Sequence, residues 1–194
     1  MKIAYFTAYL GKEFMARYCE GKRFALSGPL KSLGLARAMM AAGNDVTIYS
    51  PGVTTCNDVI PAFAESETFP EGTLHIKYCN IISKHRCDPI NQIRMARYLR
   101  RENKTEHFDV IVYYNITLGA SLLVKSMKGC IKVLEYEDNI FNKALAGDKN
   151  DFEWFKRKMY NRIISHTDGI MAVCNGLMLP EISHRVLTPG IVNE

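Results

Sequence analysis

The chain has 194 residues, of which 47% are hydrophobic and 23% are charged. This length and balance suit one α/β domain with a sizeable core and leave too little chain for two large domains. No apolar run approaches the roughly 18 residues of a membrane-spanning helix, and no signal-peptide pattern follows Met1, so we expect a cytoplasmic chain.

Strands and helices are expected to alternate along the whole sequence. Strands are predicted at residues 2–7, 44–50, 74–79, 108–114, 131–136, 169–174 and 184–188. Helices are predicted at residues 29–43, 88–104, 118–127 and 151–167, with long loops at 8–27 and 51–72. This alternation favours a single doubly wound, mostly parallel α/β sheet that covers residues 1–194 as one domain.

The segment from Ser27 to Gly43 is expected to form a phosphate-type loop and a helix that begins at the ligand-binding edge of the sheet. Pro29 suits the first turn of a helix, where its missing N–H costs nothing, and Gly43 suits the left-handed position that ends a helix. The first N–H groups of this helix would point toward the carboxyl ends of the strands, where α/β proteins bind ligands. Ser27 and Gly28 are therefore candidates for binding a diphosphate, and an ordinary helix cap is the open alternative.

Motifs for common cofactors are missing. No G-x-G-x-x-G motif follows the first strand, and Asp45 stands at the beginning of the second strand rather than at its end, which argues against an NAD enzyme. The six cysteines show no C-x-x-C spacing, so we interpret them as reduced core thiols. The five histidines show no metal-ligand spacing, and neither a metal nor another cofactor is expected.

Several stretches together point to a known family. They are Gly28 before the helix, residues 35–48, residues 108–111 and residues 172–174. In their order and spacing they resemble the N-terminal, acceptor-side domain of GT-B fold glycosyltransferases, specifically the glycosyltransferase family 4-like domain. Residues 188–192 are similar to the segment that closes this domain. The resemblance implies a Rossmann-like fold and a retaining transferase that needs no metal.

The same resemblance implies the classes of substrate and a second domain. The substrates would be a sugar nucleotide and a saccharide or lipid-linked acceptor, in surface polysaccharide or lipopolysaccharide-type assembly. A second domain, expected to be absent from this chain, would bind most of the sugar nucleotide. The 194 residues alone are therefore predicted to fold without transferring sugar. The rival hypothesis is a non-catalytic α/β module that binds a small anionic ligand or a protein partner.

Acidic residues cluster at the carboxyl end of the strand predicted at 131–136, namely Glu135, Glu137 and Asp138. Carboxylates there could bind acceptor hydroxyl groups or lie near a developing oxocarbenium ion, so Glu137 and Asp138 are the candidate catalytic residues. Neighbouring residues of a strand face opposite ways, and which of the two points inward stays open. The alternative is a solvated loop with a helix cap.

Tyr113, Tyr114 and Asn115 end the preceding strand and are further candidates for binding substrate. Their rings and amide could stack on a sugar and form hydrogen bonds to it. Tyrosines at the end of a buried strand also commonly belong to the core, so both interpretations stay open.

A basic face is expected on the helix at residues 88–104. Residues 84–104 contain seven Lys and Arg and two acids, and the resulting excess of five equals the formal charge of the whole chain, +5. Arg94, Arg97 and Arg101 share one side of the helix. This side could contact the anionic inner face of a membrane, or it could bind a lipid phosphate. The alternative is a solvated helix face. Binding of nucleic acid is not expected, because interleaved aromatic residues and a reader motif are missing.

Overall fold

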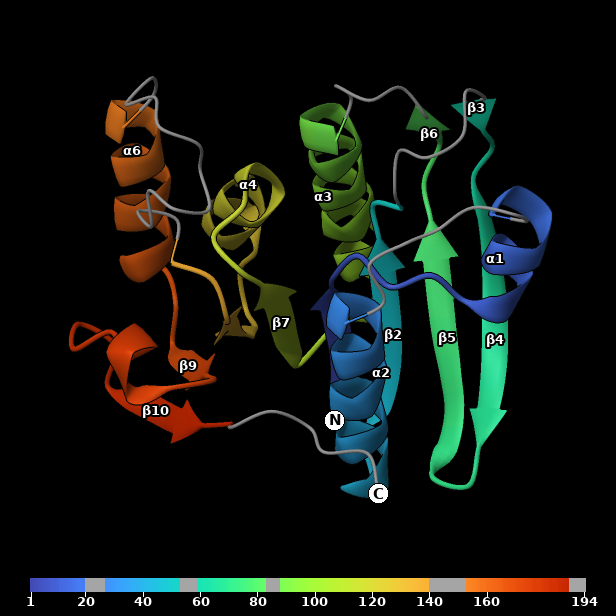
Figure 1. Cartoon of the computed structure of the whole chain (residues 1–194), viewed down its shortest axis with the longest axis horizontal. Helices are drawn as coiled ribbons and strands as arrows, with labels where there is room; N and C mark the ends of the chain where they lie inside the picture. The colour runs from blue at the N-terminus through green and yellow to red at the C-terminus, as the bar shows by residue number, and fades with distance from the viewer. Residues whose placement is uncertain (20–26, 53–58, 83–87, 140–152, 189–194) are drawn as a thin grey trace.

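The computed structural model describes residues 1–19, 27–52, 59–82, 88–139 and 153–188 (Figure 1). The strands of its large sheet are β1 (Lys2–Phe6), β2 (Asp45–Ser50), β4 (Phe63–Phe69), β5 (Gly72–Tyr78), β7 (Val110–Tyr114), β8 (Ile131–Tyr136), β9 (Gly169–Ala172) and β10 (His184–Leu187). A small sheet contains β3 (Val59–Ile60) and β6 (Ile81–Ile82). The helices are α1 (Lys12–Tyr18), α2 (Ser27–Ala41), α3 (Asp88–Glu106), α4 (Leu118–Ser126), α6 (Glu153–Ile164) and the 3-10 helix η1 (Asn175–Leu177).

The large sheet has the strand order β10-β9-β8-β7-β1-β2-β5-β4. Neighbouring strands are parallel except β4 and β5, which pair antiparallel at one end of the sheet. The direction of winding reverses between β1 and β7, which is the switch point at which open α/β sheets bind ligands. The predicted doubly wound, mostly parallel α/β sheet is therefore confirmed.

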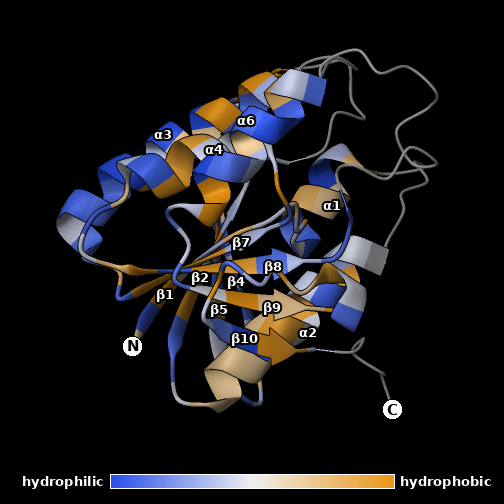
Figure 2. Cartoon of the chain, turned by 90° about the vertical axis from the view of Figure 1, so that its left-hand side faces the viewer, coloured by the Kyte–Doolittle hydropathy of each residue, from blue (hydrophilic) through white to orange (hydrophobic). Residues whose placement is uncertain are grey.

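Helices cover both faces of the sheet. α3, α4 and α6 pack in a row over one face, and α2 packs against β2 and β5 on the other (Figure 2). Because side chains alternate along a strand, Ala4 and Phe6 of β1 enter the core under α3, whereas Ile3 and Tyr5 enter the core under α2. Tyr5 thereby reaches α2, and its hydroxyl lies 3.4 Å from Ser32 Oγ.

Most predicted boundaries are confirmed within a few residues. α2 begins at Ser27, which places Pro29 in its first turn, and Gly43 follows the helix with a φ of +79°. β8 has the predicted bounds, and α3 extends two residues beyond the predicted end. None of the described helices combines the length and apolarity needed to cross a membrane.

Two predicted loops are wrong in part. α1 lies within the loop predicted at residues 8–27, and β4 lies within the loop predicted at 51–72. β4 lacks the usual strand pattern because the two side chains that it buries are Glu65 and Glu67, which are 7% and 6% exposed. A sequence pattern that places apolar residues inside cannot detect such a strand.

Glu65 and Glu67 hold the first turn of α1. The N–H of Glu13 donates to Glu65 Oε2 (2.7 Å), and the N–H of Lys12 donates to Glu67 Oε1 (2.8 Å). The Tyr78 hydroxyl also donates to Glu65 Oε1 (2.9 Å). These carboxylates satisfy N–H groups that have no partner inside the helix. The seven-residue helix α1 therefore depends on a strand that follows it much later in the chain.

The described cysteines form no disulfide with one another. Cys19 and Cys79 are buried and Cys130 is half-buried, as expected of core thiols, but Cys174 is exposed, because it follows the end of β9. Cys56 and Cys87 lie outside the described residues. Within the described ranges, no group of three or more His, Cys, Asp or Glu side chains could hold a metal ion.

Candidate functional site

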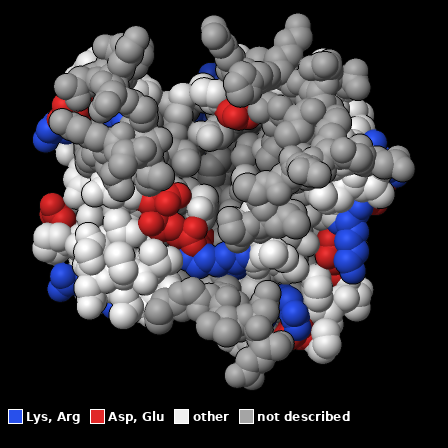
Figure 3. Space-filling view, viewed as in Figure 1, with Lys and Arg blue, Asp and Glu red and all other residues white. Residues whose placement is uncertain are grey.

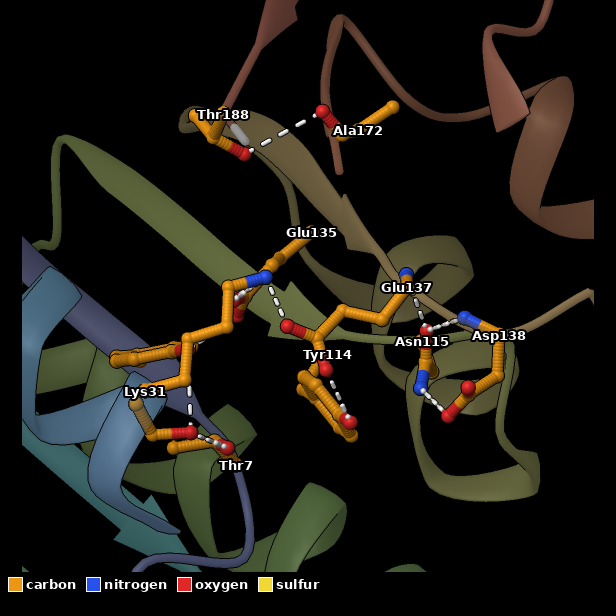
Figure 4. Close-up of polar contacts among 11 residues, drawn as sticks. Thr7, Lys31, Tyr114, Asn115, Glu135, Glu137, Asp138, Ala172 and Thr188 are labelled. Carbon is orange, nitrogen blue, oxygen red and sulfur yellow. Dashed lines mark hydrogen bonds and ion pairs between the residues drawn. The ribbon is translucent and has the colours of Figure 1, made fainter. Parts of the chain in front are cut away.

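Polar side chains from α2, β7 and β8 meet at the carboxyl edge of the sheet (Figure 4). Glu135 is the next-to-last residue of β8, Glu137 follows the strand, and Lys31 lies in the second turn of α2. In the space-filling view, acidic and basic atoms lie next to each other near the middle of this face (Figure 3). β7 adjoins the switch point between β1 and β7, and β8 is the next strand of the sheet.

Lys31 lies between two carboxylates. Its Nζ is 3.4 Å from Glu135 Oε1 and forms a second ion pair with Glu137 Oε1. The side chain of Lys31 is 14% exposed, and those of Glu135 and Glu137 are 1% and 17% exposed. One ammonium group therefore pairs with two carboxyl groups in a place with little water, where charge interactions are stronger than at the surface.

The buried acid of this group is Glu135. Burial raises the pKa of its carboxyl, while the hydrogen bond from Tyr5 and the charge of Lys31 oppose that rise. The Tyr5 hydroxyl donates to Glu135 Oε2, and burial together with the Glu135 charge raises the pKa of Tyr5 as well. Thr7 and Ser32 extend the network, with 2.8 Å between their hydroxyl oxygens.

Tyr114 and Gly28 complete the group around Glu137. The Tyr114 hydroxyl donates to Glu137 Oε2 (2.6 Å), and burial raises the pKa of Tyr114 to about 12, so it stays a donor at neutral pH. A Cβ added to Gly28 would lie 3.9 Å from the Tyr114 hydroxyl oxygen. The first turn of α2 and the end of β8 therefore lie at one place, as the parallel topology predicts.

Asn115 organises the turn that follows β8. Its φ is +54°, a left-handed conformation that Asn adopts more readily than most residues. Asn115 Oδ1 accepts hydrogen bonds from the N–H groups of Glu137 (2.8 Å) and Asp138 (3.1 Å), and Nδ2 donates to Asp138 Oδ2 (3.0 Å). Its own N–H donates to the Glu135 carbonyl oxygen (2.7 Å). Because these bonds occupy its amide, Asn115 is placed to orient the two acids.

The orientation left open for Glu137 and Asp138 is decided by these contacts. Glu137 is half-buried and turns toward Lys31 and Tyr114, while Asp138 is exposed and turns toward Asn115. Neither acid belongs to a merely solvated loop, since each carboxylate has at least one partner within the protein.

Tyr113 does not belong to this group. It is fully buried, it packs in the core under α3 and α4, and its hydroxyl is hydrogen-bonded to Thr167 Oγ1. Strand alternation turns it to the face opposite from Tyr114. The interpretation of Tyr113 as substrate-binding is therefore corrected to a core position. Ser27 is the first residue of α2, and its side chain lies outside the described part of the structure.

Lys31 and Tyr5 are the two members of the site that sequence reasoning missed. Lys31 looks like one polar residue on an amphipathic helix, and Tyr5 looks like one apolar residue of a buried strand. A weak signal was present, because an acid within a buried strand such as Glu135 requires a cation or donor nearby. The sequence does not indicate which residue supplies this cation or donor.

Arg94, Arg97 and Arg101 lie elsewhere, on the exposed side of α3. The predicted common face is confirmed, since all three line a groove between this helix and the end of β5. Contact of this face with a membrane stays a prediction.

Comparisons with solved structures support the fold. Sucrose-phosphate synthase from Thermosynechococcus elongatus is similar with a TM-score of 0.57 and 10% identity, over 88% of this chain and 42% of that chain. The catalytic domain of starch synthase IV from Arabidopsis thaliana, solved with ADP and acarbose bound, is similar with a TM-score of 0.52 and 9% identity, over 88% of this chain and 44% of that one. The chain thus spans less than half the length of these two proteins.

Both similar proteins are GT-B glycosyltransferases, so the chain has the fold of one domain of such enzymes. At these identities the likeness concerns the fold alone. No protein-family model and no curated protein sequence matches the chain.

Proposed function

We propose that this chain is the acceptor-side domain of a retaining, sugar-nucleotide-dependent glycosyltransferase in surface polysaccharide or lipopolysaccharide-type assembly. The observation that carries the proposal is the cluster of Lys31, Glu135 and Glu137 at the switch point of a sheet whose fold glycosyltransferases share. Carboxylates and hydroxyl groups at the carboxyl edge suit a ligand that presents many hydroxyl groups.

Glu137 and Asp138 are assigned to the acceptor and to the sugar that is transferred. In the proposed reaction, an acceptor hydroxyl oxygen forms a bond to the anomeric carbon while the bond from this carbon to the nucleoside diphosphate breaks, and the hydroxyl proton passes to the departing diphosphate. Positive charge develops on the sugar ring, and preoriented carboxylates stabilise such charge. Lys31 and Tyr114 hold Glu137 in one orientation, which reduces the reorganisation needed during the reaction.

Gly28 is assigned to the departing diphosphate. It lies in the first turn of α2, where N–H groups without partners in the helix favour an anion. The absence of a side chain lets a ligand approach the backbone closely. In this proposal a second domain supplies most contacts with the sugar nucleotide, and Gly28 assists them.

The proposal includes a lipid-linked acceptor at an anionic membrane surface. Its support is the exposure of Arg94, Arg97 and Arg101 together on α3. Basic side chains near an anionic bilayer each favour binding by about 1 kcal/mol.

Transfer by the full-length protein tests the function. The protein is incubated with nucleoside diphosphate sugars and saccharide acceptors, and release of nucleoside diphosphate is measured. We expect release that depends on Glu137 and Asp138, and none from the 194 residues alone. Release by the 194 residues alone would contradict the assignment as one half of an enzyme. The non-catalytic module would be favoured if the full-length protein releases no nucleoside diphosphate with any donor and binds a small anion.

A further inference from the structure

Four arginines on α3 have no acidic partner within the described ranges of the chain. They are Arg94, Arg97, Arg100 and Arg101, and all four are exposed. The acids in the second half of this helix are used elsewhere, since Glu102 pairs with Lys77 and Glu106 pairs with Lys2. Among the residues that the structure describes, no carboxylate lies within ion-pair distance of any of the four guanidinium groups. The strip therefore presents uncompensated positive charge.

The arginine strip separates two grooves. The first has a volume of about 460 Å³, lies between α3 and the end of β5, and is lined by the four arginines with Asn80 and Tyr98. The second has a volume of about 330 Å³ and lies between α3 and α4, which pack side by side (Figure 2). Arg97 and Arg100 line both grooves. A ligand held by these two arginines can therefore extend into either groove.

The second groove is apolar inside and basic at its rim. Ile93 and Ala96 of α3 and Leu122 of α4 supply its apolar lining. Arg97 and Arg100 stand on one side of it, and Lys125 of α4 stands on the other. Burial of an alkyl chain on such a lining is favourable in proportion to the apolar area removed from water.

We propose that the two grooves form one binding site for an amphiphile that carries a phosphate group and an alkyl chain. Guanidinium groups match phosphate oxygens with paired hydrogen bonds, so Arg97 and Arg100 bind the phosphate. The alkyl chain lies along Ile93, Ala96 and Leu122 in the second groove. The site is built from α3 and α4, whereas the carboxylate cluster is built from α2, β7 and β8, so the proposal does not depend on transferase activity.

Binding of short alkyl phosphates tests the site directly. Calorimetric titrations with inorganic phosphate, butyl phosphate and octyl phosphate, the last below its micelle concentration, compare the contributions of charge and chain. We expect affinity to rise with chain length, by up to about fourfold for each CH₂ group that is buried. Equal affinity for the three ligands, or no binding of octyl phosphate, would overturn the proposal.

Variants separate the two halves of the site. Arg97→Gln with Arg100→Gln should weaken octyl phosphate binding by at least about tenfold. Leu122→Ser should weaken the binding of octyl phosphate and leave that of inorganic phosphate unchanged. The control is Arg157→Gln with Arg185→Gln, which removes the same charge from exposed positions on α6 and β10. An equal loss of octyl phosphate affinity in this control would mean that the net charge of the protein, and not the site, causes the effect. This result would overturn the proposal.

Vesicles identify the source of the amphiphile. Vesicles of phosphatidylcholine with and without phosphatidylglycerol are sedimented with the wild-type chain and with the double arginine variant. Binding that requires phosphatidylglycerol and is lost in the variant supports the site and assigns it to membrane lipids. Binding of octyl phosphate without binding to vesicles supports the site for a soluble phosphate ester. Binding to neither overturns it, provided that circular dichroism shows a folded chain.

Discussion

Two pairs of glutamates lie on or directly after strands of this sheet, and they are held in different ways. Glu65 and Glu67 on β4 accept hydrogen bonds from backbone N–H groups of α1 and from tyrosine hydroxyls. Glu135 and Glu137 at the end of β8 are held by the Lys31 ammonium and by tyrosine hydroxyls. The carboxylates of the first pair contact a helix terminus, whereas those of the second pair contact side chains in the part of the structure that is described.

The difference separates structural acids from acids that are available to a ligand. A carboxylate bound to the first turn of a helix cannot leave without exposing N–H groups that then have no partner. The Glu137 carboxylate is held by a lysine and a tyrosine and its side chain is 17% exposed, so a ligand can approach it without the loss of backbone hydrogen bonds. This contrast supports the assignment of the β8 pair to the site and of the β4 pair to the fold.

The largest expected effect concerns the structural pair. Glu65→Ala should lower the free energy of unfolding by about 3 kcal/mol, because it leaves the N–H of Glu13 and the Tyr78 hydroxyl without an acceptor in a buried place. Urea denaturation followed by circular dichroism measures the change. The control is Glu71→Ala, whose partner Arg37 is more exposed. If Glu65→Ala lowers the free energy of unfolding no more than this control does, Glu65 is not one of the acids that stabilise the fold.

The second effect concerns the proposed site. Glu137→Gln in the full-length protein should reduce turnover by at least about 100-fold, because an electrostatic contact with the developing charge is lost. The free energy of unfolding should change by only about 1 kcal/mol, since Lys31 keeps Glu135 as a partner. Steady-state kinetics and urea denaturation give the two values. Turnover equal to that of Glu71→Gln would remove Glu137 from the site.

Gly28→Val tests the approach of the diphosphate. Among the described residues, an added Cβ meets the Tyr114 hydroxyl at the ordinary contact distance of 3.9 Å, so the free energy of unfolding should change by less than about 1 kcal/mol. Turnover of the full-length protein should fall by about tenfold, because the branched side chain blocks a close approach to the backbone. Parallel losses in both measurements would indicate that Gly28 serves the fold.

The smallest expected effect is a dependence of stability on pH through Glu135. Burial raises the pKa of its carboxyl above the ordinary value of 4.5, so the folded state keeps this proton to a higher pH than the unfolded state. Its contribution to stability is therefore complete below about pH 4.5 and decreases as the pH rises through the folded-state pKa. In Glu135→Gln this part of the pH dependence should disappear, and urea denaturation from about pH 4 to about pH 8 measures it. Parallel curves for the two proteins would contradict the raised pKa of Glu135.

Much of the fold could be predicted because its elements carry local signals. The helix that contains Pro29 and ends before Gly43 and the buried strand at residues 131–136 follow the usual patterns of caps and apolar runs, and they were predicted closely. β4 and α1 were missed because Glu65 and Glu67 reverse the expected pattern of burial and cap the helix from a distant strand.

The sequence by itself determined the fold class and the place of the acids, since parallel strands bring Glu135, Glu137 and Asp138 to the edge that the first turn of α2 also reaches. Tertiary structure alone decided how these acids are held. Strand order placed β8 beside β7 and one further strand from β1, which brought Lys31 to Glu135 and Glu137 and Tyr5 to Glu135. Strand alternation separated Tyr114 from Tyr113 by turning them to opposite faces. Such contacts join residues far apart in the chain, and they depend on the order of strands and on the relative position of helix and sheet, which local sequence patterns do not encode.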